Sequence, residues 1–496
     1  MTVASSSDSN RPASRPLTLD EIFLRSVARR PDAPALIDPP DRTGITGHAP
    51  RRLTYAEADR AVSALAGRFI ETGLMPGAVI AAQLPNTVEA MIAMLAALRA
   101  GLVIALLPQL WRLTELSDAL NRVGAQALVT MARIDGVNHA DLALRAAAST
   151  FSVGRVHAFG NGLPDGVSAL DDIFDMPTPA FDFPEQDARN AAIITFDVTR
   201  DGLRVVPRTQ LQLSAGGLAV TLEAHLSHGA PMLSAMMPSS FAGLCVSFMT
   251  WLLNGGALVL HHPFDAATLL GQLARENCAP LVAPGALLPR LDQRGDLAKL
   301  PSLRDVLGLW RLPGRALTTP AWRAPSTFTD VHAFGEAGLV AARRGSDGLP
   351  AALFPETSRA ARPQPVGEIV LTRHGTLGLR GAMAPLSAYA SPIDDEAAPD
   401  HIDTGYPAAL DRRNGAIVVH ASPIALACVG GYRFAGSDLA RWAERMPPDT
   451  TLTAMPDDVS GFRLTGRSPE TPRVRMVLTE TGVNPLLVEA FRDRTA

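Results

Sequence analysis

The chain has 496 residues, of which 47% are hydrophobic and 19% charged, and this composition is typical of a globular protein with a sizeable core. The length allows two to four domains, or one large enzyme with a small appended domain. A formal net charge of −4 excludes a strongly basic protein, so neither nucleic acid nor an anionic membrane surface is an expected partner.

The cysteines Cys245, Cys278 and Cys428 lie too far apart in the sequence for a metal-binding or redox motif. We interpret them as small buried side chains in a reducing compartment. Residues 1–16 are rich in Ser, Asn, Pro and Arg and lack the apolar core of a signal peptide, so we expect a disordered lead.

Two apolar stretches approach the length of a membrane span. An arginine, a glycine and a proline interrupt Met91–Leu110, and Asn-Gly-Gly interrupts Ser240–Leu260. Each stretch fits a helix, a turn and a strand better than an uninterrupted span. We therefore expect no membrane span and a cytoplasmic protein.

The first half of the chain alternates between predicted helices and strands. Capping boxes at Thr18–Glu21 and Thr54–Glu57 predict two helix starts. Asn86 is expected to cap a further helix, and Gly124 to end another. Strands are expected at 35–37, 78–84, 102–107 and 127–130. The alternation returns between residues 232 and 276, which predicts parallel sheets in two doubly wound α/β subdomains.

The amino-acid composition changes near residue 350. Between Pro350 and Pro399, Pro and Ala become frequent and short strands such as 367–372 are expected, which suits a small β-rich subdomain. Residues 402–405 and 416–420 are expected to form a hairpin-like pair. The remaining segment, from residue 421, is expected to be a short α+β domain with helices near 437–445 and 485–492.

The stretch from Ile193 to Gln210 carries the clearest functional pattern. It begins as an apolar strand and ends in Pro207-Arg208-Thr209 before an apolar run. It resembles the phosphate-binding loop of the adenylate-forming superfamily, which includes acyl-CoA synthetases, aryl-acid–AMP ligases and nonribosomal adenylation domains. In that comparison Thr199 takes the place of a loop threonine and Arg204 that of the loop lysine. Arg208 and Thr209 match a tail seen in the aryl-acid branch.

The glycines of this loop have been replaced. Asp197, Val198 and Asp201 stand where the family has small residues. A phosphate cradle brings backbone N–H groups close to the anion in conformations that glycine adopts easily. Two aspartates would repel a triphosphate, and the planar guanidinium of Arg204 differs from a compact ammonium. The sequence therefore predicts that the fold persists while ATP chemistry is impaired.

The segment Val331–Gly338 resembles the family motif that ends in a magnesium-binding glutamate. Without a gap, Glu336 takes the place of that glutamate and His332 that of the aromatic residue beside the adenine. A short deletion would instead place Phe334 and Gly335 on the aromatic–glycine pair. Carboxylates suit Mg²⁺ because it prefers hard oxygen ligands. The alternative is a surface turn whose glutamate faces solvent.

Asp403-Thr404-Gly405-Tyr406 resembles the family's Thr-Gly-Asp, whose aspartate holds the ribose hydroxyls. Thr404 keeps the threonine position, and Tyr406 replaces the aspartate. A phenol can donate or accept a hydrogen bond but offers no bidentate charged acceptor. A plain turn is the alternative interpretation.

The cations that the family uses near its C-terminus are also missing. Counting back from Gly430-Gly431, Ala421-Ser422 take the place of a Gly-Arg pair, and the hinge at 423–425 has no charge. Lys299 is the only lysine in the chain, so the family's C-terminal lysine is absent. Candidates for substituting it are Arg473, Arg475, Arg492 and Arg494, and no spacing favours one of them.

Phe241 lies near the position where relatives place a His or Asn against the acid substrate, so a surviving substrate pocket would be apolar there. A core phenylalanine is the alternative. His261-His262 is not expected to bind metal, because adjacent strand residues point to opposite faces of a sheet.

The resemblance extends from about residue 17 to residue 434 and implies both a fold and a chemistry. The fold is α/β: a large N-terminal domain (17–420) of two doubly wound α/β subdomains plus a small β-rich subdomain, then a shortened α+β C-terminal domain (421–496). The implied cofactors are ATP or AMP with Mg²⁺. The implied partners are a small carboxylic acid and an acceptor, either coenzyme A or a carrier protein.

Three hypotheses follow. The first is a descendant of an acid–AMP ligase that binds a carboxylic acid or nucleotide while adenylation is weakened or lost. The second is an active acyl-CoA synthetase or acid–AMP ligase in which Arg204 and Glu336 are catalytic. The third is a non-enzymatic scaffold or regulatory subunit. We favour the first, because losing one stabiliser of the developing charge typically costs about 10²- to 10³-fold in rate and several are missing here.

Overall fold

A computed structural model describes residues 15–177, 181–262, 264–355, 367–390, 400–423 and 425–492. Several sequence predictions fall outside these ranges: most of the disordered lead (residues 1–14), parts of the Pro350–Pro399 segment, the central hinge residue Ile424, and Arg494.

One sheet belongs to the first α/β subdomain, and its strands follow the order β11-β10-β4-β3-β5-β8-β9. Neighbouring strands are parallel except for the antiparallel hairpin β10–β11 at one edge. The bounds are β3 Val79–Ala82, β4 Val103–Leu106, β5 Ala127–Met131, β8 Arg155–Phe159, β9 Val167–Ala169, β10 Ala191–Thr199 and β11 Gly202–Thr209.

A second sheet forms the other α/β subdomain, in the order β17-β16-β15-β14-β12-β13-β1-β2. It is parallel except at its edges, where β17 and β2 run antiparallel to their neighbours. The bounds are β1 Pro34–Ile37, β2 Arg52–Thr54, β12 Met232–Ser234, β13 Leu258–Leu260, β14 Pro280–Pro284, β15 Asp305–Trp310, β16 Thr327–Phe334 and β17 Gly338–Arg343.

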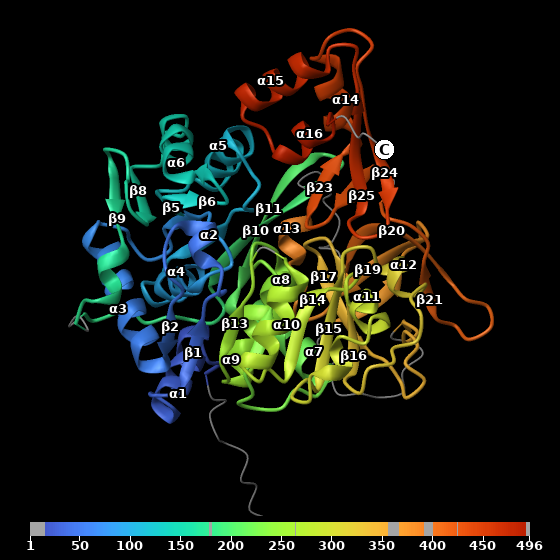
Figure 1. Cartoon of the computed structure of the whole chain (residues 1–496), viewed down its shortest axis with the longest axis horizontal. Helices are drawn as coiled ribbons and strands as arrows, with labels where there is room; N and C mark the ends of the chain where they lie inside the picture. Colours follow the sequence, from blue (N-terminus) through green and yellow to red (C-terminus); the bar gives the residue numbers. More distant parts are fainter. Residues whose placement is uncertain are drawn as a thin grey trace, which may run out of the picture.

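Helices cover the two sheets (Figure 1). Those before the β10–β11 hairpin are α1 Leu19–Arg29, α2 Arg42–Thr46, α3 Tyr55–Glu71, α4 Val88–Arg99, α5 Leu113–Val123, α6 His139–Ala148 and the 3₁₀ turn η1 Asp171–Phe174; a short β6–β7 hairpin spans Arg133–Ile134 and Val137–Asn138. Those after it are α7 Gln210–Ala224, α8 Phe241–Leu244, the π-helical turn η2 Cys245–Met249, α9 Thr250–Asn254, α10 Ala266–Arg275, α11 Leu288–Gln293, the 3₁₀ turn η3 Leu297–Lys299 and α12 Pro313–Ala316.

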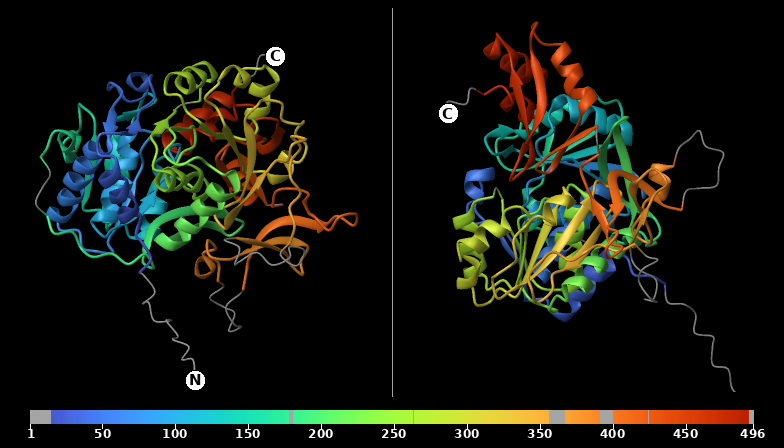
Figure 2. Two further views of the ribbon diagram at one scale, coloured as in Figure 1. Left: turned by 90° about the horizontal axis from the view of Figure 1, so that it is seen from below. Right: turned by 90° about the vertical axis from the view of Figure 1, so that its right-hand side faces the viewer.

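Two smaller sheets complete the fold. The β-rich subdomain has the order β18-β19-β20-β21 and the C-terminal domain the order β23-β22-β25-β24. Figures 1 and 2 show the C-terminal domain, in red, lying across both α/β subdomains. The bounds are β18 Glu368–Leu371, β19 Thr376–Arg380, α13 Leu386–Tyr389, β20 Ile402–Leu410, β21 Ile417–Val419, β22 Leu426–Val429, β23 Tyr432–Ala435, α14 Gly436–Glu444, β24 Thr451–Asp457, β25 Gly461–Arg467, α15 Thr471–Thr481 and α16 Pro485–Glu489.

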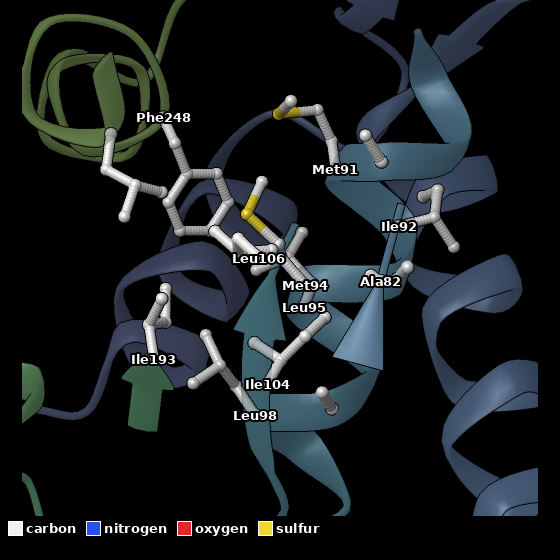
Figure 3. Packing of buried hydrophobic residues seen from close by; sticks show 14 of the residues in the cluster. Ala82, Met91, Ile92, Met94, Leu95, Leu98, Ile104, Leu106, Ile193 and Phe248 are labelled. Atoms are coloured by element: carbon white, nitrogen blue, oxygen red, sulfur yellow. The ribbon is translucent and has the colours of Figure 1, made fainter. Parts of the chain in front are cut away.

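The main core lies where the two α/β subdomains meet. Helix α4 is buried along its whole length, as expected for a helix that is apolar on all sides. In Figure 3, Phe248 from the second subdomain packs against Met94 and Leu106 of the first, beside Ile193 of β10. The start of the β10–β11 hairpin is therefore anchored in the centre of the molecule.

The predicted fold class is confirmed: parallel α/β sheets, a small β-rich unit and a smaller C-terminal domain. Both predicted capping boxes form, and Gly124 ends its helix with a positive φ. The prediction for Asn86 is wrong. Thr87 occupies the cap position of α4, while the buried amide of Asn86 donates to the carbonyls of Ser234 and His261. A contact between subdomains took precedence over the local cap.

In the described part of the chain, every helix is too short or too polar to cross a lipid bilayer. The domain boundary near residue 421 stays a prediction.

Candidate functional site

The stretch that resembles a phosphate loop is a closed β-hairpin. Thr199 pairs with Gly202 across the strands, so Arg200-Asp201 form the whole turn. The Thr199 hydroxyl donates to the Gly202 carbonyl (3.0 Å) and accepts from the Asp201 N–H (3.2 Å). Backbone and side-chain groups that would face a phosphate in an open loop therefore satisfy one another.

Arg204, at the position of the family lysine, is used in packing. Its Nη1 donates to the carbonyl of Ala388 (3.0 Å), and its guanidinium lies 5.0 Å from the ring centre of Tyr389. Both partners belong to α13 of the β-rich subdomain. The contact holds that short helix against the hairpin, so this side chain is committed to a structural contact.

Arg208 belongs to strand β11 of the hairpin, and its side chain is fully buried. It donates to the carbonyls of Met383 (2.8 Å) and Glu336, and its guanidinium stacks 3.6 Å from the ring centre of Phe241. Burial lowers the pKa of Arg208, although Glu336 opposes that shift. Phe241 is thus a core residue beside a buried cation.

Thr209 caps helix α7. Its hydroxyl accepts from the Gln212 N–H (3.2 Å), and the Gln212 side chain accepts from the Thr209 N–H (3.0 Å). This reciprocal pair is the capping box that starts the helix.

Glu336 lies 5% exposed between the two subdomains. Its carboxylate accepts from the N–H of Phe241 at the start of α8 (2.7 Å). Burial, and then the neighbouring Asp197, raise the pKa of Glu336. Mg²⁺ needs ionised oxygen ligands and space for its waters. Within the described residues no group of three or more His, Cys, Asp or Glu side chains could hold a metal. The Glu336 carboxylate is engaged by the α8 amide, and magnesium binding at this position stays a prediction.

The centre of the site is an ion pair between domains. Asp197 of β10 accepts from Arg433 Nη1 (2.8 Å) and from the Tyr389 hydroxyl (2.7 Å). Arg433 lies on β23 of the C-terminal domain, and its Nη2 donates to the Tyr406 hydroxyl (2.7 Å). Burial alone would lower the pKa of Arg433, but Tyr406 and Asp197 raise it well above its ordinary value.

Tyr406, at the position of the family's ribose-binding aspartate, completes this network. Its hydroxyl donates to the carbonyl of Arg311 (3.2 Å), and burial raises its pKa to about 12. Phe334 packs edge-on against its ring, with 5.3 Å between ring centres. Thr404 donates to the carbonyl of Leu377 (2.6 Å) and so stays within its own sheet.

His332 is buried in the second sheet, and neither ring nitrogen has a hydrogen-bond partner among the described residues. Burial lowers its pKa. Gly335 lies at the site itself with a φ of +60°, and a Cβ there would clash with the guanidinium of Arg433. The backbone beside Arg433 therefore requires glycine.

A small cavity remains at this point. Its volume is about 10 Å³, on the order of the space for one water molecule. Its lining includes Arg311, Ala333, Gly335, Cys428, Tyr432 and Arg433. This cavity is much smaller than a nucleotide.

Sequence reasoning did not select three residues that form this site: Arg311, Tyr389 and Arg433. It named Asp197 only as a replacement that would repel a triphosphate. Arg433 follows the Gly430-Gly431 pair that marks the family's C-terminal segment, and this position was the available signal. Arg311 directly follows the buried strand β15, and a charge at the carboxyl end of a parallel strand is a recognised position for ligand contacts.

Residues 23–196 match the family described as AMP-binding enzyme. A salicylyl-CoA synthase / salicylate adenylyltransferase from Streptomyces sp is 26% identical over 48% of this chain and 45% of its own length. A salicyl-AMP ligase / salicyl-S-ArCP synthetase from Mycobacterium tuberculosis is 40% identical over 17% of this chain and 14% of its own length. The chain spans less than half the length of the curated relatives it matches.

Among solved structures, the amide bond synthetase McbA from Marinactinospora thermotolerans superposes with a TM-score of 0.68 over 95% of this chain and 94% of its own. The two sequences are 16% identical, so this likeness establishes the fold.

Proposed function

We propose that this chain is a carboxylic-acid-binding relative of the acid–AMP ligases of the adenylate-forming superfamily, in which ATP-dependent adenylation is weakened or lost. Coenzyme A or a carrier protein as partner, and a cytoplasmic location, remain part of the proposal. Two relatives carry salicylate in their names, so aryl acids are the first substrates to test.

The observation that carries the proposal is the position of Arg433. Its guanidinium bonds to Asp197 in the hairpin that replaces the phosphate loop, and to Tyr406 at the ribose-binding position. It therefore connects the places at which relatives of this family hold the phosphates and the sugar. The chain's own side chains take up the hydrogen-bonding groups and the space that a nucleotide would need.

The charged side chains near the site also support the proposal that adenylation is weakened or lost. ATP with Mg²⁺ would supply an activated phosphoryl group, and fixed cations must meet the charge that develops on it. Arg208 contacts backbone carbonyls in the core, and Arg433 is neutralised by Asp197. The acidic Asp197 stands where a triphosphate would need donors.

The contacts of Arg204 and Glu336 argue against the alternative of an active ligase that uses them. Arg204 is bonded to α13, and Glu336 to the amide that starts α8. A scaffold or regulatory role stays open as the third hypothesis, and it would show neither acid binding nor adenylation.

ATP–pyrophosphate exchange tests the proposal directly. We expect no exchange above background with salicylate, benzoate or medium-chain fatty acids, and no change on Glu336→Gln. Isothermal titration with the same acids without ATP should detect binding to the full chain. Exchange that depends on an acid and is abolished by Glu336→Gln would overturn the proposal and support the active ligase.

A further inference from the structure

The site holds more positive than negative charge. Among the described residues, Arg208, Arg311 and Arg433 meet here, and the carboxylates beside them are Asp197 and Glu336. Asp197 pairs with Arg433 at 2.8 Å. Even with Glu336 fully ionised, one positive charge has no counterpart, and the raised pKa of Glu336 increases that excess.

Arg311 is the arginine of this site that has no carboxylate partner among the described residues. Its Nη2 donates to the Ser240 hydroxyl (3.0 Å), and it forms no ion pair with any carboxylate in the described ranges. Burial lowers the pKa of Arg311, and the attraction of the more distant Glu336 only partly offsets this effect. Arg311 is partly exposed, and the donors that Ser240 does not use are available to an anion in the adjoining cavity.

The position of Arg311 is fixed from several sides. It follows directly on β15, and its own carbonyl accepts from the Tyr406 hydroxyl (3.2 Å). Gly431 lies beside the Arg311 guanidinium. A Cβ placed on this glycine would be 3.8 Å from Arg311 Nη2. The guanidinium thus points into the cavity that it shares with Arg433.

We propose that Arg311 and Arg433 bind a small monovalent anion in this cavity, either a free halide ion or one oxygen of a carboxylate group. Two arginine side chains face the space, and the walls at Ala333 and Gly335 carry little or no side chain. The volume of about 10 Å³ matches a single water-sized occupant, so phosphate is too large. The bound anion balances the third arginine and links β15 to the C-terminal domain.

Chloride and small carboxylates supply the test. The full chain is prepared in a halide-free sulfate buffer and titrated with chloride, formate or benzoate at constant ionic strength. We expect broadening of the ³⁵Cl resonance and a rise in the melting temperature with chloride. Arg311→Gln should weaken chloride binding by roughly tenfold or more, the effect of losing a charged hydrogen bond.

Arg441→Gln is the control, because Arg441 lies in the C-terminal domain with Arg433, is 59% exposed and pairs with Asp438 at 3.1 Å. It should bind chloride as the parent does. Displacement of chloride by formate or benzoate identifies a carboxylate as the occupant, whereas chloride binding without displacement identifies a halide. Equal chloride binding in Arg311→Gln and the parent protein would overturn the assignment.

A second measurement does not depend on the variant folding. Crystals of the parent protein soaked in bromide should show an anomalous peak between Arg311 and Arg433, and a soak that labels other surface sites and leaves this cavity without a peak would contradict the proposal. The inference is separate from the loss of adenylation, since pyrophosphate exchange decides that question whatever the anion result.

Discussion

The part of the chain before Asp197 and the part after it differ in how closely they follow the family pattern. The family match ends at residue 196, one position before Asp197. Up to that point the chain depends on apolar strands and helix α4, whose packing accepts many hydrophobic substitutions of similar volume. Beyond it the site depends on individual charges, and there the residues differ from the family pattern. The comparison indicates that packing can keep a fold while the charged residues at its site change.

The residues around Asp197 form a connected network of hydrogen bonds. Arg433 donates to Asp197 at 2.8 Å and Tyr389 at 2.7 Å, and Arg433 also donates to the Tyr406 hydroxyl at 2.7 Å. A carboxylate that would repel a triphosphate instead receives donors from the β-rich subdomain and from the C-terminal domain. The altered site therefore contributes to joining the domains.

The largest expected effect comes from breaking the pair of Asp197 and Arg433. Arg433→Met leaves Asp197 buried without its cation and should destabilise the protein by about 3–5 kcal/mol. Urea unfolding measures the loss. The double variant Asp197→Asn, Arg433→Met should lose less than Arg433→Met alone, because the uncompensated charge is gone.

Arg441→Met serves as the exposed control and should change the unfolding free energy by less than about 1 kcal/mol. A loss in Arg433→Met as small as this would mean that the charged site does not hold the domains together.

An intermediate effect is expected in the preserved region and depends on pH. His157 on β8 is buried, and burial lowers its pKa to about 4. The unfolded chain, with a histidine pKa of about 6.5, then binds a proton more readily than the folded protein. Stability should fall as the pH drops from about 6.5 to 4, by up to roughly 3 kcal/mol.

His157→Leu should remove this part of the pH dependence while leaving the rest unchanged. The measurement is urea unfolding at pH 7 and pH 5 for both proteins. If acidification destabilises the variant as much as the parent, His157 does not contribute to acid sensitivity.

The smallest effect compares equivalent helix caps on the two sides of residue 196. Thr54 caps α3, and Thr209 caps α7 with the same reciprocal hydrogen bonds. Thr54→Ala and Thr209→Ala should each cost about 1 kcal/mol. Thermal unfolding can measure both. A much larger loss for Thr209→Ala would show that this family-like position has a role beyond its cap.

Much of the fold could be predicted because its signals are local. Thr18 with Glu21, and Thr54 with Glu57, place their own helix starts within one turn. The alternation of strands and helices follows from hydrophobic periodicity along the chain. Asn86 shows the limit, since its amide found partners 148 and 175 residues away in place of the cap.

The site could be predicted only in part. The positions of Arg204, Arg208, Glu336 and Tyr406 were predicted by resemblance, but their contacts were not. Arg433 reaches Asp197 across 236 residues, and no local pattern indicates such a pairing. The excess of arginine over carboxylate became visible only when the position and the partners of Arg311 were known.

The sequence by itself determined the class of fold and several helix starts, because these depend on residue type and near neighbours. Only the tertiary structure decided that the site is closed by Arg433 and that Arg311 faces a cavity with unmatched charge. Burial and distant pairing set the energy of an ion inside a protein, and neither can be read from the order of residues.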